Sequence, residues 1–564
     1  MDLRNHVRSG LTRTERSIRR TWATRGGVVT TILLLLLGIS LTVPHRVRQT
    51  DPIQGDTFEV DGTVFDVSLS PPDHLAHLST EGLEAVRIPP GPDFSDLPIR
   101  KPALALAHVR PRIRCYAQQF SHDVGQPVRL FYAEDPQGTP ARANTPIDSY
   151  AIYDASSDTL LLNKKWETGV SQPRREACRS HRGQGCAFTM HQDLATEHLP
   201  AGVYFAVLLD VHGPVSDQVY FVIRPAPAGA GHDRIAVMYP TFTWQAYNDI
   251  GGGSFYSTEP PQGRFEVSLL RPVPSNIMAD IHNARATVPF VRHLRRMGVS
   301  PLHLSNLDLH EHPDYLQSVK VLILTGHDEY WTAEMRQAVD QFLERGGRLA
   351  VFAGNVCWWK INVRGPRLLV NKSGENTTDP EYQDTGNWYQ PWIHHPVQAT
   401  FGLTNHVGGY AVPYFWSLDD ALKRGVSQAD YESAYAITVT APGHRIFRET
   451  GLKSGDRFGL DSLLVDFEPD TVPLHPDGSP TSSEMKAFPA TLQVLGTAMV
   501  VNPYFTAVDG TKGRVVTNGV LTEHTTPAGG RVLHFGTSGW FGALDVDDVV
   551  PSLIFRNAIA YLAE

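Results

Sequence analysis

The stretch Val319–Asn355, VKVLILTGHDEYWTAEMRQAVDQFLERGGRLAVFAGN, decides the fold. Its first run, residues 319–326, is continuous, apolar and rich in β-branched residues, as is typical of a parallel strand buried on both faces. Thr332 stands where it would cap a helix, because the apolar residues after it recur at helical spacing as far as the glycine pair 346–347. A second apolar run occupies residues 348–355. Strand, helix and strand within about 35 residues predict a βαβ unit and hence a parallel sheet.

The pattern extends in both directions and predicts one α/β domain over residues 234–564. A buried strand is expected at 234–240, and a strand followed by a loop at 530–540. Helices are expected at 285–297 and near 551–563. We expect the core sheet of this domain to be largely parallel.

A different pattern precedes this domain. Residues 113–225 contain short runs of alternating polar and apolar residues separated by Gly, Pro and Asp, which predict an antiparallel, Ig-like β-sandwich. The run LPAGVY at 199–204 is typical of a sandwich corner, where Tyr204 would pack or cap the backbone. A hinge rich in Pro, Ala and Gly at 225–232 separates the two domains.

The N-terminal part predicts a membrane anchor. Residues 26–44 are nineteen uncharged residues, which as a helix would be roughly 28 Å long, about the thickness of a bilayer core. Seven arginines in the basic segment 1–25 predict a cytoplasmic N-terminus, a stalk at 45–110 and an extracytoplasmic body, that is, a single-pass protein of the cell membrane. A cleaved signal peptide is the alternative, although no A-x-A-like site follows the apolar run. The pair Arg19-Arg20 leaves export by the twin-arginine or the general secretory route open.

Composition excludes some classes of function. A net charge of −9 over 564 residues offers no basic surface for nucleic acid. The four cysteines form no C-x-x-C pair, so a structural zinc site is not expected. Cys178 and Cys186 lie eight residues apart and would close a small disulfide loop in an oxidising compartment, or remain two free thiols. Oligomeric state cannot be derived from the sequence.

Candidate site residues follow the predicted strands. In open α/β sheets, ligands bind beyond the carboxyl ends of the strands, so the segments 243–256, 326–331, 354–359 and 536–540 should converge on one crevice. Tyr247, His327, Glu329 and Asn355 would then face one another, together with Asp328 and Tyr330.

These same segments carry a family resemblance. The runs TWQAYN (243–248), GGGSFY (251–256), GHDEYW (326–331), FAGN (352–355) and GTSGW (536–540), in that order, resemble the large, catalytic subunit of N,N-dimethylformamidase and its relatives. The resemblance covers residues 235–564 well and the sandwich more loosely. It implies an α/β domain akin to class I glutamine amidotransferases, flavodoxin-like in architecture. It also implies one iron, held by tyrosine phenolates and a glutamate.

The resemblance assigns roles to individual residues. Tyr247 and Glu329 match metal ligands, His327 matches the active-site histidine, and Asn355 matches an asparagine that lines the pocket. The remaining metal tyrosine has no motif, and the nearest candidates are Tyr204 and Tyr239. The family's further glutamate, expected near residue 460, leaves Asp461, Asp466 and Glu468 open.

The donor types agree with this implied chemistry. Phenolate and carboxylate oxygens are hard ligands that suit a hard metal ion. Such an ion would polarise an amide carbonyl or acidify a bound water. His327 would pass a proton to the leaving amine, and Asn355 would donate a hydrogen bond to the oxyanion. We therefore expect a metal-dependent hydrolase of a C–N amide bond, with iron as cofactor and a small-molecule amide as substrate.

Other interpretations remain open at this point. The chain could be a non-catalytic extracytoplasmic protein that binds a sugar or peptide in the aromatic crevice, or an assembly partner in the cell envelope. Asp328 and Glu329 could merely cap the next helix, His327 could bond only to backbone, and Tyr247 could be a core aromatic. Three further features are expected to be structural: a turn at 251–253, a buried Cys357, and surface positions for His303, His310 and His312. No G-x-S-x-G elbow supports a serine hydrolase.

Overall fold

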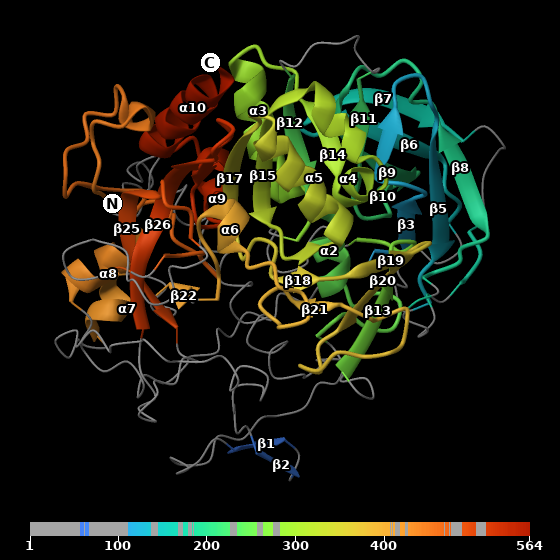
Figure 1. Cartoon of the computed structure of the whole chain (residues 1–564). Coiled ribbons are helices and arrows are strands. Elements are labelled where there is room, and N and C mark those ends of the chain that lie inside the picture. The colour runs from blue at the N-terminus through green and yellow to red at the C-terminus, as the bar shows by residue number, and fades with distance from the viewer. Residues whose placement is uncertain are drawn as a thin grey trace, which may run out of the picture.

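The computed structural model describes β1 (Thr57–Val60), β2 (Thr63–Asp66) and most of residues 111–564. The longer gaps in that range are 137–144, 167–172, 226–233, 257–262, 274–281, 412–417, 424–426, 475–487 and 503–514, and the short ones are 177, 179–182, 184, 407, 409, 467 and 473. The strands of residues 113–224 stand beside a larger part built from residue 234 onward (Figure 1).

Residues 113–224 form two sheets with a shared core. One sheet joins β3 (Ile113–Ala117), β5 (Val128–Glu134) and β8 (Met190–Leu194). The other runs in the order β4 (Ser121–Asp123), β11 (Val219–Arg224), β9 (Gly202–Asp210), β6 (Ser149–Asp154) and β7 (Thr159–Lys165), with β10 (Gly213–Pro214) beside β9. Only the pairing of β4 with β11 is parallel among those described. Tyr204 closes the expected corner by donating to the Pro200 carbonyl at 2.6 Å.

The central sheet of the larger part is mixed. Its parallel half runs in the order β14 (Leu302–Ser305), β12 (Arg234–Tyr239), β15 (Val319–His327), β17 (Arg348–Gly354) and β27 (Arg531–His534). Its other half is antiparallel and consists of β26 (Val515–Thr525), β25 (Gln493–Asn502), β23 (Ile437–Val439) and β24 (Arg457–Phe458), with β22 (Tyr410–Ala411) on β25.

The expected fold class is therefore wrong as stated. A largely parallel, flavodoxin-like sheet describes only half of this ten-stranded sheet, and several smaller sheets accompany it. The physical reason is that β25 and β26 connect directly as long antiparallel neighbours, which need no helical crossover. The smaller sheets pair β13 (Arg264–Ser268), β20 (Arg367–Asn371) and β19 (Asn362–Arg364), and also β16 (Tyr330–Trp331), β18 (Trp359–Lys360) and β21 (Gly386–Asn387).

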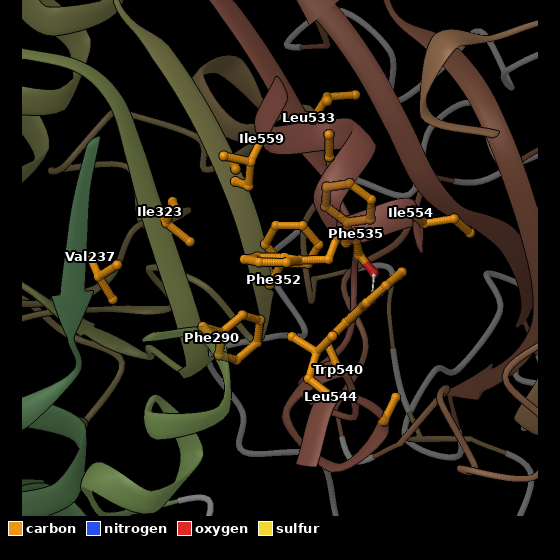
Figure 2. Close-up of a cluster of buried hydrophobic side chains, with 14 of the residues drawn as sticks. Val237, Phe290, Ile323, Phe352, Leu533, Phe535, Trp540, Leu544, Ile554 and Ile559 are labelled. Atoms are coloured by element: carbon orange, nitrogen blue, oxygen red, sulfur yellow. Dashed lines mark hydrogen bonds between the residues drawn. The ribbon is translucent and has the colours of Figure 1, made fainter. Parts of the chain in front are cut away.

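Helices cover both faces of the parallel half. Successive strand residues point to opposite faces, so Leu322 and Leu324 join one core and Val321 and Ile323 the other. The first core receives α4 (Asn306–Glu311) and α5 (Ala333–Glu344), and the second receives α3 (Val288–Arg296), α9 (Trp540–Asp545) and α10 (Val549–Ala563). Figure 2 shows the second core, where the Phe352 and Phe535 rings stack with centroids 4.0 Å apart. Three shorter helices are α6 (Gln398–Phe401), α7 (Leu418–Lys423) and α8 (Gln428–Tyr435).

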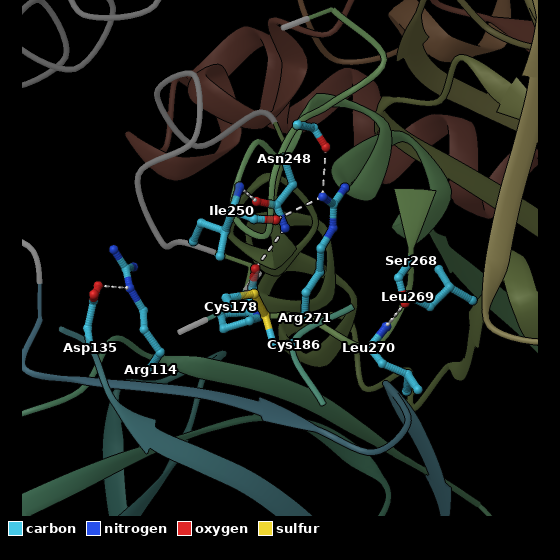
Figure 3. Close-up of a disulfide and its surroundings, with 12 residues drawn as sticks. Arg114, Asp135, Cys178, Cys186, Asn248, Ile250, Ser268, Leu269, Leu270 and Arg271 are labelled. Atoms are coloured by element: carbon cyan, nitrogen blue, oxygen red, sulfur yellow. Dashed lines mark hydrogen bonds and ion pairs between the residues drawn. A yellow bond between two sulfur atoms is a disulfide. The ribbon is translucent and has the colours of Figure 1, made fainter. Parts of the chain in front are cut away.

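The local predictions around the quoted stretch are confirmed. β15, α5 and β17 form the βαβ unit, with Val321 opposite Arg348 in parallel register. The Thr332 side chain caps α5 by accepting from the Met335 amide at 3.3 Å. Cys178 and Cys186 form a disulfide, which lies beside Arg271 (Figure 3).

The expected transmembrane anchor and membrane location need correction. Among the residues that the structure describes, no helix is both long and apolar enough to cross a membrane. The longest apolar helix, α10, has 15 residues and is therefore about 22 Å long, short of the ~30 Å hydrocarbon core. The segment 26–44, on which the expectation rested, lies outside the described residues.

Candidate active site

The carboxyl ends of the parallel strands deliver the candidate residues to one place. β12 leads into α2 (Thr241–Tyr247), whose seven residues are all buried and whose last residue is Tyr247. β15 ends at His327, directly before Asp328 and Glu329. β17 ends at Gly354, directly before Asn355. Adjacent parallel strands bring these three loops together, as the sequence predicts.

Three phenols gather around the Glu329 carboxylate. Tyr247 donates to Oε2 of Glu329 at 2.8 Å, and Tyr256 donates to Oε1 at 2.9 Å. The hydroxyl of Tyr330 in turn contacts that of Tyr256. The rings of Tyr247 and Tyr256 stack with centroids 4.4 Å apart. Burial, and then the charge of Glu329, raise the pKa of all three phenols well above 10.

A histidine pair adjoins this cluster. Nδ1 of His327 lies 2.8 Å from Nε2 of His282, and Nε2 of His327 lies 3.1 Å from Oε2 of Glu468. Burial acts to lower the pKa of His327, but the hydrogen bond to Glu468 and the charges of Glu468 and Glu329 outweigh it, so this pKa is raised. Burial and then the neighbouring His327 lower the pKa of His282 well below its usual range. His282 is therefore neutral and serves as the hydrogen-bond partner of His327.

Asn355 connects the loop after β17 to Glu468. Its Nδ2 donates to Oε2 of Glu468 at 2.8 Å, and its Oδ1 is buried with no hydrogen-bond partner among the described residues. Asn355 has φ of 47° and Glu468 has φ of 48°, a left-handed conformation that is uncommon outside glycine. Backbone strain of this kind clusters at functional sites.

A second buried pair supports these loops from behind. Oδ2 of Asp470 accepts from the Val356 amide at 3.0 Å and lies 3.3 Å from Nε2 of His534. His534 Nδ1 bonds to the Phe401 carbonyl at 3.0 Å. Asp470 thus ties the loop that carries Asn355 to strand β27 and to the chain after Glu468.

Lys372 approaches the cluster from β20's end. Its Nζ donates to the Tyr330 hydroxyl at 2.8 Å and lies 4.0 Å from the centroid of the Tyr256 ring. Burial lowers the pKa of Lys372 to about 7, against the opposing charges of Glu329 and Glu468. Burial also raises the pKa of Asp328 to about 7. The site therefore mixes carboxyl, phenol, imidazole and amine groups in a volume from which water is largely excluded.

The structure brings together the four residues selected from sequence. Tyr247 bonds to Glu329, and His327 and Asn355 both bond to Glu468. Among the three candidates for the further acid, Glu468 is the one in the site, since Asp461 is exposed and Asp466 bonds through its amide to Thr537.

The proposed extra tyrosines are not in the cluster. Tyr204 bonds to Pro200 in the sandwich, and Tyr239 bonds to Nδ1 of His303 at 3.0 Å. His303 is also not a surface residue, as expected from sequence, because it is only 1 % exposed. The predicted turn at 251–253 and the buried Cys357 are confirmed.

Sequence reasoning missed Tyr256, Tyr330, His282 and Lys372. Tyr256 lay within a quoted motif, nine residues after Tyr247 and just past three glycines with positive φ, so the turn was the available indication. Tyr330 adjoins Glu329 and was expected only to face the crevice. No pattern distinguishes His282 or Lys372, because they reach the site from elements far away in sequence.

The donor set fits a hard metal ion. Within the described part of the chain, no group of three or more His, Cys, Asp and Glu side chains has the arrangement of a metal site. The cluster instead offers phenol oxygens and one carboxylate, which are hard donors. Because burial raises the pKa of these phenols, a cation beside them is what would make their ionisation favourable.

Fold and site define an α/β protein with a mixed sheet whose strand ends enclose a phenol, carboxylate and histidine cluster. The chain belongs to the family of N,N-dimethylformamidase beta subunit-like proteins, whose C-terminal family model matches residues 149–552. Comparison with curated proteins finds no match.

Proposed function

We propose that this chain is an iron-dependent hydrolase that cleaves the C–N bond of a small amide. The observation that carries the proposal is the convergence of Tyr247 and Tyr256 on the Glu329 carboxylate, 3.9 Å from the imidazole of His327. Family membership supports the same reaction class, since the family is described by an amide hydrolase.

Glu329, Tyr247 and Tyr256 would hold the metal ion. When bound, the ion supplies Lewis acidity, which polarises an amide carbonyl and makes water a better nucleophile. Tyr256 is the second phenolate in this proposal because it contacts both oxygens of Glu329, at 2.9 and 3.2 Å.

His327 and Glu468 would handle the proton. Their side chains share a contact of 3.1 Å, and Glu468 raises the pKa of the imidazole, so the pair can hold a proton at Nε2 and release it to the leaving amine. His282 fixes the orientation of this imidazole through Nδ1. The Asn355 amide holds Glu468 in position, and its unpartnered Oδ1 could accept a hydrogen bond from the attacking water.

The experiment measures dimethylamine release from N,N-dimethylformamide by the purified, iron-loaded chain. His327→Ala should lower kcat by roughly 100- to 10,000-fold while iron content stays at the wild-type level. His310→Ala is the matched control, because His310 bonds to Thr332 behind the same loop without contacting the cluster. Equal activity of His327→Ala and wild type would contradict the proposal.

A further inference from the structure

A cavity of about 210 Å³ lies between the β-sandwich and the α/β part, apart from the Glu329 cluster. Its sandwich wall is the segment 115–121 with Arg224, and its opposite wall includes Thr241 and Trp244 of α2 and residues of α4. Neither Glu329 nor His327 lines it.

Two buried hydrogen-bond donors of this cavity have no acceptor. Oγ1 of Thr241 and Nε1 of Trp244 lack a hydrogen-bond partner in the described part of the chain, although these residues are 8 % and 2 % exposed. An indole N–H can only donate, so Trp244 requires an acceptor atom. Buried polar groups in folded proteins are nearly always paired, and two unpaired donors on one short helix indicate a missing acceptor.

The charges around the cavity favour an anion. Arg224 is neutralised by ion pairs with Asp123 and Asp308. Arg271, which is 1 % exposed, bonds only to neutral oxygens of Gln245, Ile250 and Gly253 among the residues described (Figure 3). The charge of Asp249 acts on Arg271 without an ion pair within 4 Å. A buried guanidinium with no carboxylate partner leaves an excess of positive charge beside the cavity.

The remaining lining is apolar and wide enough for a ring. Phe120 packs edge-on against Trp244, with centroids 5.4 Å apart, and Leu307 and Val273 also line the cavity. A cavity of ~150 Å³ accommodates benzene, so this one has room for a ring with a small polar group.

We propose that this cavity is a binding site for a small organic carboxylate, whose oxygens accept from Trp244 and Thr241 beside Arg271 and whose apolar part packs on Phe120. The site is independent of the proposed hydrolysis, because none of the residues that hold the carboxylate belongs to the Glu329 cluster. It would sense a metabolite at the contact between the two parts of the protein. Helix α2 ends at Tyr247, so occupancy of the cavity is one helix away from the Glu329 carboxylate.

Titration calorimetry of the purified full chain with benzoate tests the proposal, with benzyl alcohol as an uncharged ring of similar size. Wild type should bind benzoate at least about tenfold more tightly than benzyl alcohol, because a hydrogen bond to a charged group exceeds one to a neutral group. Thr241→Val and Trp244→Phe each remove one donor and keep most of the shape, and each should weaken benzoate binding by about 10- to 100-fold. The unfolding temperature of each variant verifies that it is folded.

Glu329→Gln is the control for binding at the other cluster and should leave the benzoate affinity unchanged. Four results would overturn the proposal: no heat with millimolar benzoate, equal affinity for benzyl alcohol, unchanged affinity in both donor variants, or loss of binding in Glu329→Gln. None of these results depends on amide hydrolysis, so failure here is distinguishable from failure of the proposed function.

Discussion

Glu468→Gln is the substitution that most specifically tests the proton-handling half of the site. Glutamine keeps the shape of the side chain and the contact with Asn355, but removes the negative charge that lies 3.1 Å from Nε2 of His327. A hydrogen bond to a charged group contributes about 1.5–3 kcal/mol, which corresponds to roughly 10- to 150-fold in a rate or equilibrium. We therefore expect kcat/KM to fall by that factor.

The pH profile should move as well, and its direction follows from the raised pKa of His327. With Glu468 present, the imidazole keeps its proton to higher pH than burial alone would allow. Without that charge, burial dominates and the proton is lost at lower pH. The alkaline limb of kcat/KM should therefore shift to lower pH.

The assay is hydrolysis of N,N-dimethylformamide by iron-loaded protein across pH, with Asp466→Asn as the matched control. Asp466 lies two residues away in the same loop, and its removal takes away an acid of the same charge that makes no side-chain contact with His327. A wild-type rate and pH profile in Glu468→Gln would refute the reasoning, as would the same loss in Asp466→Asn.

Three further outcomes follow from the described contacts. Phe352→Ala should lower the free energy of unfolding by about 3–5 kcal/mol in denaturant titration, since Phe352 is fully buried, whereas Leu161→Ala, at a side chain that is 43 % exposed, should change it by under ~0.5 kcal/mol. Cys186→Ser should cost about 2–3 kcal/mol by opening the short loop to Cys178, and reductant should then have no further effect. For Asp328, the folded-state pKa of about 7 lies above the unfolded value of 3.8, so its contribution to stability is complete below pH ~4 and is lost as pH rises through 7. Asp328→Asn should therefore remove a decline of up to about 4 kcal/mol in that window, and parallel pH curves for both proteins would contradict the assignment.

The sequence predicted the parts of the fold that depend on local pattern. The βαβ unit at Val319–Asn355 was predictable because period, cap and glycine stop all agree over one continuous stretch. The antiparallel half of the sheet was not, because β25 and β26 pair across a sequence with several register shifts and no turn motif. Long-range antiparallel pairing leaves no periodic signature that distinguishes it from a parallel edge.

The site divides in the same way. Tyr247, His327, Glu329 and Asn355 follow strands directly, so the rule that strand ends converge was sufficient to group them. Glu468 could not be chosen over Asp461 and Asp466 from sequence, because the choice depends on which side chain a left-handed backbone directs at His327. His282 and Lys372 arrive from outside the parallel strands, where only tertiary packing fixes their position.

Iron content and colour of the purified chain test the central claim most directly. Wild type should contain about one iron per chain and absorb in the visible region through phenolate-to-iron charge transfer. Tyr247→Phe should lose the band and the metal together, whereas Tyr239→Phe, which removes an equally buried phenol bonded to His303 instead, should keep both. A wild-type protein that takes up no iron, or a Tyr247→Phe protein with unchanged iron and colour, would contradict the account.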